Sequence, residues 1–259
     1  MTKGVFVLTG TGTSQGVPII GCTCEVCSSG DYRDKRLRTS AYLSMGGTSV
    51  WVDPGPDFRQ QVLRLGLKEL DAVLVTHEHK DHTGGLDDIR GFNHLLNRDM
   101  PIYAWERVLG RLKADYAYAF EEVKYPGIPR LNLYPVDGDR VVIGNIPFQV
   151  FTVMHYRLPV LAFRVGSIGY VTDANAISPE GMDILQGVDT LVLDALQPEP
   201  HISHFTLDQA IEVAQTIGAR RTLLTHISHR MGLYTVRNPT LPKGIELGYD
   251  GLKVEFWLW

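Results

Sequence analysis

Two hydrophobic patterns alternate along the chain, and together they predict a mixed α/β fold. Short apolar runs bounded by polar residues predict strands, and apolar residues three or four positions apart predict helices. The expected strands cover 4–9, 40–45, 48–53, 70–76, 140–143, 147–154, 160–165, 168–172, 189–194, 222–226 and 252–258. The expected helices lie near 56–66, 83–96, 105–122, 178–187 and 206–218. No linker interrupts the alternation, so we expect sheets covered by helices in a single domain over residues 1–259.

A dense run of potential metal ligands follows the apolar run 72–75. It contains His77, His79, Asp81 and His82. A continuous apolar run predicts a buried strand, and α/β sheets hold ligands beyond the carboxyl ends of such strands. His77 and His79 leave the same side of an extended segment and can bind one ion, whereas Asp81 and His82 follow as the chain turns into a helix and can serve a second. These donors suit zinc, manganese or iron better than calcium. The alternative is a solvated loop.

Four further candidates each end a separate predicted strand: Asp53, His155, Asp173 and His226. Taken singly, such a histidine can be a hydrogen-bonded structural residue, and such an aspartate can be a helix cap or turn former. The carboxyl ends of parallel strands lie on one edge of a sheet, so in a mainly parallel sheet these side chains should converge. We therefore expect His155, Asp173 and His226 as metal ligands, and Asp53 as a residue that orients a ligand.

The chain has three cysteines, Cys22, Cys24 and Cys27, in one short loop. A C-x-C spacing strains a disulfide, and the start of the chain has no apolar signal-peptide core, which favours a reducing, cytoplasmic location. Three thiolates indicate a structural zinc site that lacks one ligand. His229, three residues after His226, is the leading candidate for the fourth ligand. The alternative is a group of buried or redox-active thiols.

The run from His77 to His82 resembles the HxHxDH signature of the metallo-β-lactamase superfamily, and the later candidates follow in that family's order. The resemblance implies a four-layer αββα sandwich with two metal ions at one edge. It implies that His155 completes the first metal site, that Asp173 bridges both ions, and that His226 is the last ligand of the second ion.

A narrower resemblance comes from the N-terminal loop Thr9-Gly10-Thr11-Gly12 followed by the cysteine cluster. This combination resembles the phosphoribosyl cyclic phosphodiesterases of the PhnP type. It implies a small phosphodiester substrate, opened by metal-activated hydroxide, with Asp81 in the catalytic centre. His204 resembles the histidine that this family holds over its active site, and it would give a proton to the leaving alkoxide. His204 could instead cap the following helix.

Two other functions fit parts of the same pattern. A tRNA 3′-processing nuclease shares the metal motifs, but its basic, glycine-rich arm is not visible here, and a net charge of −4 offers no footprint for nucleic acid. A non-catalytic protein that resembles PqqB of cofactor biosynthesis would keep the cysteine site alone. The intact ligand set favours an enzyme.

Several features leave their role open. The glycines of the loop 8–18 either permit tight turns or offer amides to a substrate phosphate. The aromatic segment 116–125 serves packing, a homodimer surface or substrate stacking. No apolar stretch is long enough to cross a membrane, so we expect no membrane partner.

Overall fold

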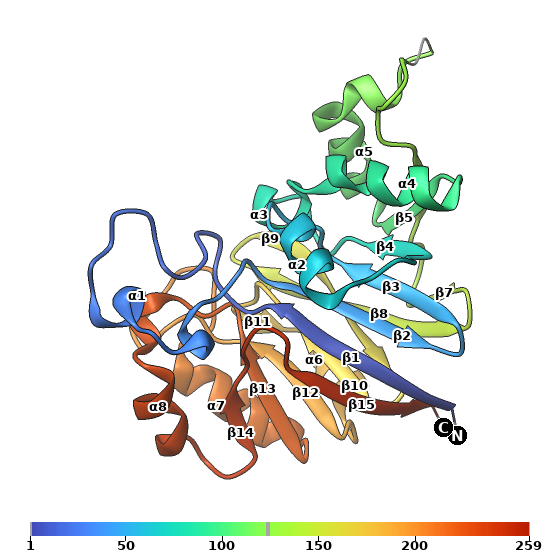
Figure 1. Ribbon diagram of the computed structural model, residues 1–259. Helices are drawn as coiled ribbons and strands as arrows, with labels where there is room; N and C mark the ends of the chain where they lie inside the picture. Colours follow the sequence, from blue (N-terminus) through green and yellow to red (C-terminus); the bar gives the residue numbers. More distant parts are fainter. Residues whose placement is uncertain (1, 123–124, 259) are drawn as a thin grey trace.

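The computed structural model describes residues 2–122 and 125–258, and in these ranges two β-sheets lie face to face (Figure 1). The first sheet has the order β15-β1-β2-β3-β4-β5-β6, and the second has the order β11-β8-β9-β10-β12-β13-β14, with β7 paired to β8. The first comprises β1 (Thr2–Gly10), β2 (Ser40–Met45), β3 (Thr48–Val52), β4 (Ala72–Leu74), β5 (Met100–Ala104), β6 (Leu131–Pro135) and β15 (Lys253–Leu258). The second comprises β7 (Arg140–Ile143), β8 (Ile146–His155), β9 (Leu158–Val165), β10 (Ile168–Val171), β11 (Ala176–Ile177), β12 (Thr190–Asp194), β13 (Arg221–Thr225) and β14 (Ile245–Leu247).

Helices cover the outer face of each sheet. The helices of the described residues are α1 (Glu25–Ser28), α2 (Phe58–Leu65), α3 (Lys80–Thr83), α4 (Arg90–Leu96), α5 (Glu106–Asp115), α6 (Pro179–Leu185), α7 (Leu207–Ile217) and α8 (Tyr234–Arg237). Short 3₁₀ turns lie at Tyr32–Asp34, Leu86–Ile89, Ala117–Ala119, His229–Met231 and Asn238–Thr240. Helices α2, α4 and α5 lie against the first sheet, and α6 and α7 lie against the second.

Three apolar clusters separate these layers and confirm the expected αββα sandwich. The central cluster joins the inner faces of both sheets, with Phe6 and Leu43 from one and Phe163 and Tyr170 from the other. A second cluster joins the outer face of the second sheet to α6 and α7. The third joins the outer face of the first sheet to α2, α4 and α5. Burial of this apolar surface supplies most of the drive for folding.

The expectation of a mainly parallel sheet was wrong, because both sheets are mixed. Strands β1, β2 and β15 pair antiparallel in the first sheet, and β7 to β10 do so in the second. Four strands of the second sheet nevertheless end at one edge. Strand β8 is antiparallel to β9, which is antiparallel to β10, and β12 and β13 run parallel to β10. Strands β8, β10, β12 and β13 therefore all end on the same side.

The expected helix 83–96 is broken in the structure, because α3 ends at Thr83 and α4 begins at Arg90. Gly84 and Gly85 lie at the break. A Cβ atom on Gly85 would come within 2.1 Å of the carbonyl oxygen of Gly55, so only glycine permits this approach. At this break the end of the HxHxDH segment packs against the loop that follows β3.

Other boundaries also differ from the predictions. The expected helix 105–122 ends at Asp115 and is followed by the short turn at Ala117–Ala119. The sequence analysis missed β5, β6, β11 and β14, as well as α1 and α8. Strand β5 contains Pro101, which normally argues against a strand inside a sheet, and β11 and β14 are too short to have a clear period. By contrast, the expected helix 206–218 is present as α7, which begins with a capping box of Thr206 and Gln209.

Candidate metal centre and the family of the chain

The carboxyl ends of strands from both sheets meet around Asp173, which follows β10. Its Oδ1 lies 3.2 Å from Nε2 of His82 and 3.1 Å from Nδ1 of His226, and its Oδ2 lies 3.8 Å from Nε2 of His77. Oδ2 of Asp81 lies 3.3 Å from Nε2 of His82. His77, His82, Asp173 and His226 are almost completely buried. Side chains separated by up to 149 positions thus form one compact polar cluster between the sheets.

The same cluster contains nitrogen atoms without hydrogen-bond partners. Nε2 of His77, Nε2 of His82 and Nδ1 of His226 are buried and make no hydrogen bond within the described residues. Native structures rarely leave buried nitrogen atoms unpaired, and a bound ion is one of the few explanations. Imidazole nitrogens around a carboxylate are the donor set of zinc, manganese and iron sites. The residues present therefore fit divalent metal ions.

The charges in the cluster balance one another. Burial alone would raise the pKa of the Asp173 carboxyl, but His226 and His82 hold that pKa well below its usual range. Burial also opposes a charge on His82, yet Asp173, Asp81 and Asp53 raise the pKa of His82 well above its ordinary value. Burial keeps the pKa of His77 low, so that its imidazole is neutral. A cation bound among these carboxylates would take the place of the proton on His82.

Hydrogen bonds to the backs of the imidazoles fix their orientation. Oδ2 of Asp53 lies 2.8 Å from Nδ1 of His82, and the same carboxylate accepts hydrogen bonds from the amide and hydroxyl of Thr76. Nδ1 of His155 lies 2.9 Å from the carbonyl oxygen of Ser203, which must accept the hydrogen bond. Each contact leaves Nε2 of the ring free.

His79 and His155 lie toward the open side of the cluster. The ring centroid of His79 lies 4.6 Å from that of His77 and 5.2 Å from that of His155. The structure also groups His155 and Asp173 with His204, all with donor atoms within 4.8 Å of one another. His79 belongs to no such group within the described residues. The expected trio of His77, His79 and His155 is therefore adjacent, but it is less tightly gathered than the side around Asp173.

Strained backbone marks this edge of the sheets. Among the described residues, Asp53, Asn97, Tyr156, Asp173 and His226 are the non-glycine residues with positive φ. All except Asn97 lie at strand ends around the cluster. Such conformations cost on the order of 1–3 kcal/mol each and gather at functional sites. At Asp53, Asp173 and His226 this backbone allows the chain to leave the strand sharply while the side chain turns toward the cluster.

His204 stacks over the cluster and is held from behind by Asp194. Its ring centroid lies 4.6 Å from that of His226 and 4.5 Å from that of His155. Nδ1 of His204 lies 3.2 Å from Oδ1 of Asp194, and Oδ2 of Asp194 accepts the amide hydrogen of Phe205. Burial lowers the pKa of His204, but the Asp194 carboxylate outweighs this effect and raises it to about 9. The sequence analysis missed Asp194, although it ends a predicted strand, as Asp53 and Asp173 do.

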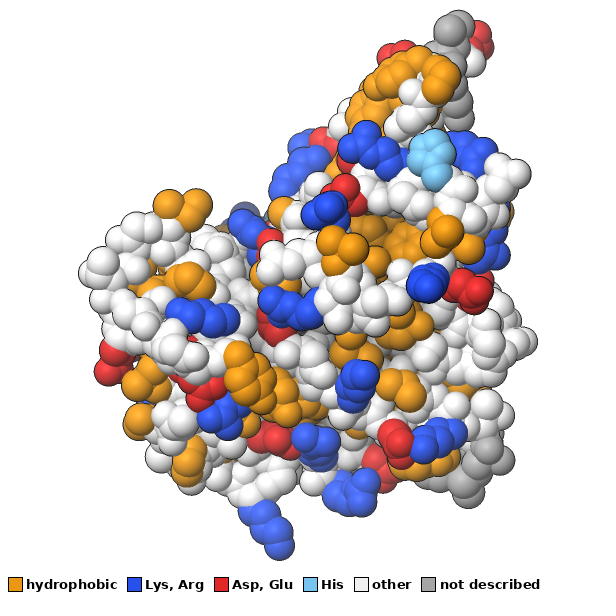
Figure 2. Space-filling model, in the orientation of Figure 1, with side chains coloured by type: hydrophobic (Ala, Val, Ile, Leu, Met, Phe, Trp, Pro, Cys, Tyr) orange, Lys and Arg blue, Asp and Glu red, His pale blue; other side chains and the backbone are white. Residues whose placement is uncertain are grey.

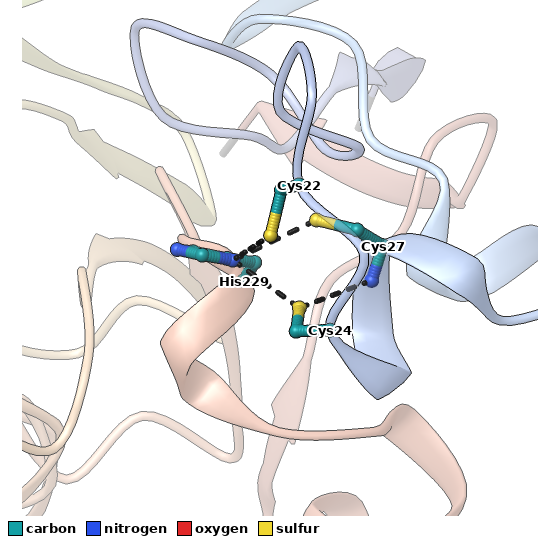
Figure 3. A group of neighbouring side chains, drawn as sticks. All are labelled: Cys22, Cys24, Cys27 and His229. Atoms are coloured by element: carbon teal, nitrogen blue, oxygen red, sulfur yellow. Dashed lines mark hydrogen bonds between the residues drawn. The ribbon is translucent and has the colours of Figure 1, made fainter.

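The three cysteines surround one histidine from the far end of the chain, as expected. Figure 3 shows Cys22, Cys24 and Cys27 around His229. Nδ1 of His229 lies 3.4, 3.3 and 3.6 Å from the sulfur atoms of Cys22, Cys24 and Cys27. The cysteines are free thiols. The amide of Cys27 and the ring of His229 lower the pKa of Cys24 to about 6, whereas burial raises the pKa of Cys27 to about 11.

Residues 48–227 match the family described as the beta-lactamase superfamily domain. A solved structure described as a new diphosphatase from the PhnP family superposes with a TM-score of 0.92 and is 39% identical in sequence. The match covers 98% of each chain. The chain belongs to the PhnP family of the metallo-β-lactamase superfamily. It is a hydrolase of that superfamily.

Two curated proteins extend the comparison. The octanoyltransferase of Porphyromonas gingivalis is 40% identical over 95% of this chain, but the chain spans only 50% of that protein. The ribonuclease Z of Pyrobaculum islandicum is 24% identical over 76% of this chain and 82% of its own length.

In this PhnP-family chain the glycine-rich loop is occupied by internal contacts. The amides of Thr11, Gly12, Thr13 and Gly16 donate to Asp250 and to the carbonyl oxygens of Leu37, Ile227 and Thr13. A Cβ atom on Gly10 would come within 1.9 Å of the carbonyl oxygen of Arg38. These glycines therefore permit close packing, and the four amides named above are used within the protein rather than offered to a phosphate.

The aromatic segment divides into buried and exposed parts. Tyr116 is buried, and its hydroxyl donates to the carbonyl oxygen of Thr83 at 2.7 Å, next to the HxHxDH segment. The hydroxyl of Tyr118 donates to Asp87. Tyr125 is exposed, and residues 123–124 lie outside the described residues. Packing is thus the role of Tyr116 and Tyr118.

The surface of this PhnP-family chain has mixed charge on the face drawn in Figure 2, where basic and acidic side chains are interspersed. Hydrophobic side chains gather on the same face over α2 and α4, where a hollow is lined by Phe58, Val62, Leu63, Phe92 and Leu95, among others. Within the described residues, no helix is long and apolar enough to span a bilayer.

Proposed function

We propose that the cluster around Asp173 holds two divalent metal ions. His77, His79 and His155 would bind the first, whereas Asp81, His82 and His226 would bind the second, with Asp173 shared by both. The observation that carries this proposal is the set of buried, unpaired nitrogens of His77, His82 and His226 beside the shared carboxylate. Zinc, manganese and iron all accept these donors.

We also propose a structural zinc ion among the cysteines and His229. With Zn–S and Zn–N bonds of about 2.3 and 2.0 Å, a tetrahedral site separates its sulfur and nitrogen atoms by roughly 3.5 Å. The three observed separations between sulfur and Nδ1 lie between 3.3 and 3.6 Å. This agreement supports a four-coordinate site without open positions, which suits a structural ion.

The reaction that we propose is hydrolysis of a phosphodiester, with a small five-membered cyclic phosphate on ribose as the first candidate substrate. Two divalent ions at the centre would lower the pKa of a water molecule and neutralise charge on the phosphoryl oxygens. His204 lies over the cluster with Nδ1 fixed by Asp194, so its Nε2 can give a proton to the departing alkoxide. His204 is thus proposed as the proton donor rather than as a ligand.

A phosphoanhydride is the second candidate linkage. It is favoured by the 39% identity to a PhnP-family protein described as a diphosphatase. A diphosphate and a phosphodiester both offer non-bridging oxygens on an anionic phosphorus, so the same residues could serve either.

Transfer RNA processing, a non-catalytic role and acyl transfer have weaker support. Transfer RNA processing would require a basic surface, whereas the chain has a net charge of −4. A non-catalytic PqqB-like role would not need the complete set of cluster residues. Acyl transfer, the activity named for the relative from P. gingivalis, lacks support because half of that relative lies outside the match.

The test combines metal analysis with a substrate panel. The purified protein, loaded with zinc or manganese, is assayed against a cyclic ribose phosphate, a nucleoside diphosphate ester, a phosphomonoester, a lactam and a thioester. We expect about three ions per chain and the highest kcat/KM for one of the first two compounds. A single ion per chain would indicate a binding protein, and preference for the lactam or thioester would refute phosphoryl hydrolysis.

A further inference from the structure

A hollow of about 480 Å³ opens directly beside the proposed metal centre. It is lined by His79, His155, Tyr156, Arg157, Leu158, Ile202 and Ser203. His79 and His155 are proposed ligands, so this hollow is continuous with the place where the reacting phosphorus would lie. A substituent of the substrate that extends from the phosphorus on this side would meet Tyr156 and Ile202.

Tyr156 occupies a turn position that disfavours it. His155 ends β8 and pairs with Leu158 at the start of β9, so Tyr156 and Arg157 form a two-residue hairpin loop. Tyr156 has φ of 58°, at the position where such loops prefer glycine or asparagine. A bulky residue with positive φ is an outlier, and strain of this kind persists at binding and catalytic sites. Tyr156 is 48% exposed, so packing in the core does not explain it.

Asn175 holds the two walls of the hollow at a set distance. Its Oδ1 accepts the amide hydrogen of Tyr156 at 2.8 Å, and its Nδ2 donates to the carbonyl oxygen of Ile202 at 3.2 Å. The amide of Asn175 donates to the carbonyl oxygen of Met154. Asn175 follows Asp173 by two residues, so the walls of the hollow and the centre of the cluster are fixed by one short segment.

The walls combine apolar surface with one positive charge. Ile202 is 66% exposed and lies opposite the hairpin loop. The guanidinium carbon of Arg157 lies 5.1 Å from the ring centroid of Tyr156. Arg157 contacts this ring and has no ion-pair partner among the described residues. An exposed tyrosine, an exposed isoleucine and a free cation are suited to a planar ring attached to an anion.

We propose that this hollow binds a planar aromatic ring of the substrate, such as a nucleobase, and that Tyr156 is its stacking surface. This inference rests on the proposed phosphoryl hydrolysis and specifies the substituent carried by the substrate. Stacking of a base on an aromatic side chain changes affinity by about 5- to 150-fold and accepts different bases. Tyr156 therefore determines specificity for ring-bearing substrates.

The kinetic test uses two compounds that differ only in the ring: adenosine 2′,3′-cyclic phosphate and 1-O-methylribose 2,3-cyclic phosphate. We expect kcat/KM to favour the adenosine compound by about 10-fold or more, the lower part of the stacking range. Tyr156→Asn suits the positive φ and lacks the ring, and it should bring the ratio of the two kcat/KM values to about 1. Tyr156→Phe should keep the ratio, as should Tyr125→Asn, a change at an exposed tyrosine elsewhere.

A binding measurement separates failure of this inference from failure of the proposed function. Calorimetry compares AMP with ribose 5-phosphate on the metal-loaded wild type and on Tyr156→Asn. We expect AMP to bind about 10-fold more tightly to the wild type and equally to the variant. If neither cyclic phosphate is hydrolysed but this binding preference holds, the subsite stands and the reaction is wrong. If Tyr156→Asn leaves both preferences intact, Tyr156 does not bind a ring.

Discussion

Nδ1 of His204 lies 3.2 Å from the carboxylate of Asp194, and the ring of His204 stacks 4.6 Å from that of His226. Asp194 ends β12 and His204 precedes α7, so the contact links a strand end to the loop over the cluster. Asp194 has no exposed surface. A buried carboxylate behind an imidazole fixes the tautomer and orientation of the ring. This pair supports the proton-donor role of His204.

His204→Ala should lower kcat for a cyclic or alkyl phosphodiester by about 100- to 10,000-fold, the usual contribution of a positioned proton donor. The loss should be much smaller for a p-nitrophenyl diester, whose leaving group needs no proton. Metal content, measured by mass spectrometry, should stay at the wild-type value. An equal loss on both substrates would assign His204 to binding, and loss of metal would assign it as a ligand.

Asp194→Asn should give a smaller loss of kcat on the same alkyl substrate, about 10- to 100-fold. The amide keeps an oxygen for the amide of Phe205 but no longer supports a positive charge on His204. The donor loses its proton on the alkaline limb of the pH profile of kcat, and the pKa read from that limb should fall relative to the wild type. A fall is expected because Asp194 raises the pKa of His204 to about 9 in the wild type. An unchanged profile would contradict the pairing.

Asp173→Ala should remove or scramble the proposed metal pair and abolish hydrolysis while the protein stays folded. Because φ of Asp173 is 49°, alanine is strained there, and Asp173→Asn is the matched variant that tolerates this backbone. Both should lose ions from the cluster and keep the zinc ion that is proposed among the cysteines. Normal turnover with two cluster ions in either variant would refute the shared-carboxylate assignment.

Cys24→Ser should lower the zinc content by about one ion per chain and reduce stability by at least about 2 kcal/mol, or about 5 °C in Tm. The sulfur of Cys24 contacts His229 and accepts the amide of Cys27, so it joins the N-terminal loop to the segment after β13. Glu25→Gln, an exposed change in the same loop, is the control. Thermal unfolding with and without a chelator measures the effect, and an unchanged zinc content would disprove the site.

Tyr116→Phe should destabilise the protein by about 1–2 kcal/mol, because its hydroxyl satisfies the buried carbonyl oxygen of Thr83. Tyr125→Phe, at an exposed position, should have no measurable effect. Urea denaturation of both variants provides the comparison. If the two variants were equally stable, the aromatic segment would not be held to the HxHxDH loop by Tyr116.

The sequence alone determined which residues are candidate ligands and which strands carry them. The HxHxDH run, the strand-end positions of Asp53, His155, Asp173 and His226, and the cysteine cluster are local patterns, and family order placed them in one fold. Apolar strands and the capping box of α7 are likewise set by neighbouring residues. For this reason the αββα sandwich and the members of both clusters could be predicted.

Only the tertiary structure decided how these groups face one another. The pairing of Asp194 with His204 depends on the loop between β12 and α7, and the tie from Asn175 to Tyr156 and Ile202 depends on three separate segments. The break after α3 follows from contact between Gly85 and Gly55, which lie 30 positions apart. Such relationships arise from long-range packing and carry no period or motif along the chain, so a reading of neighbouring residues could not reveal them.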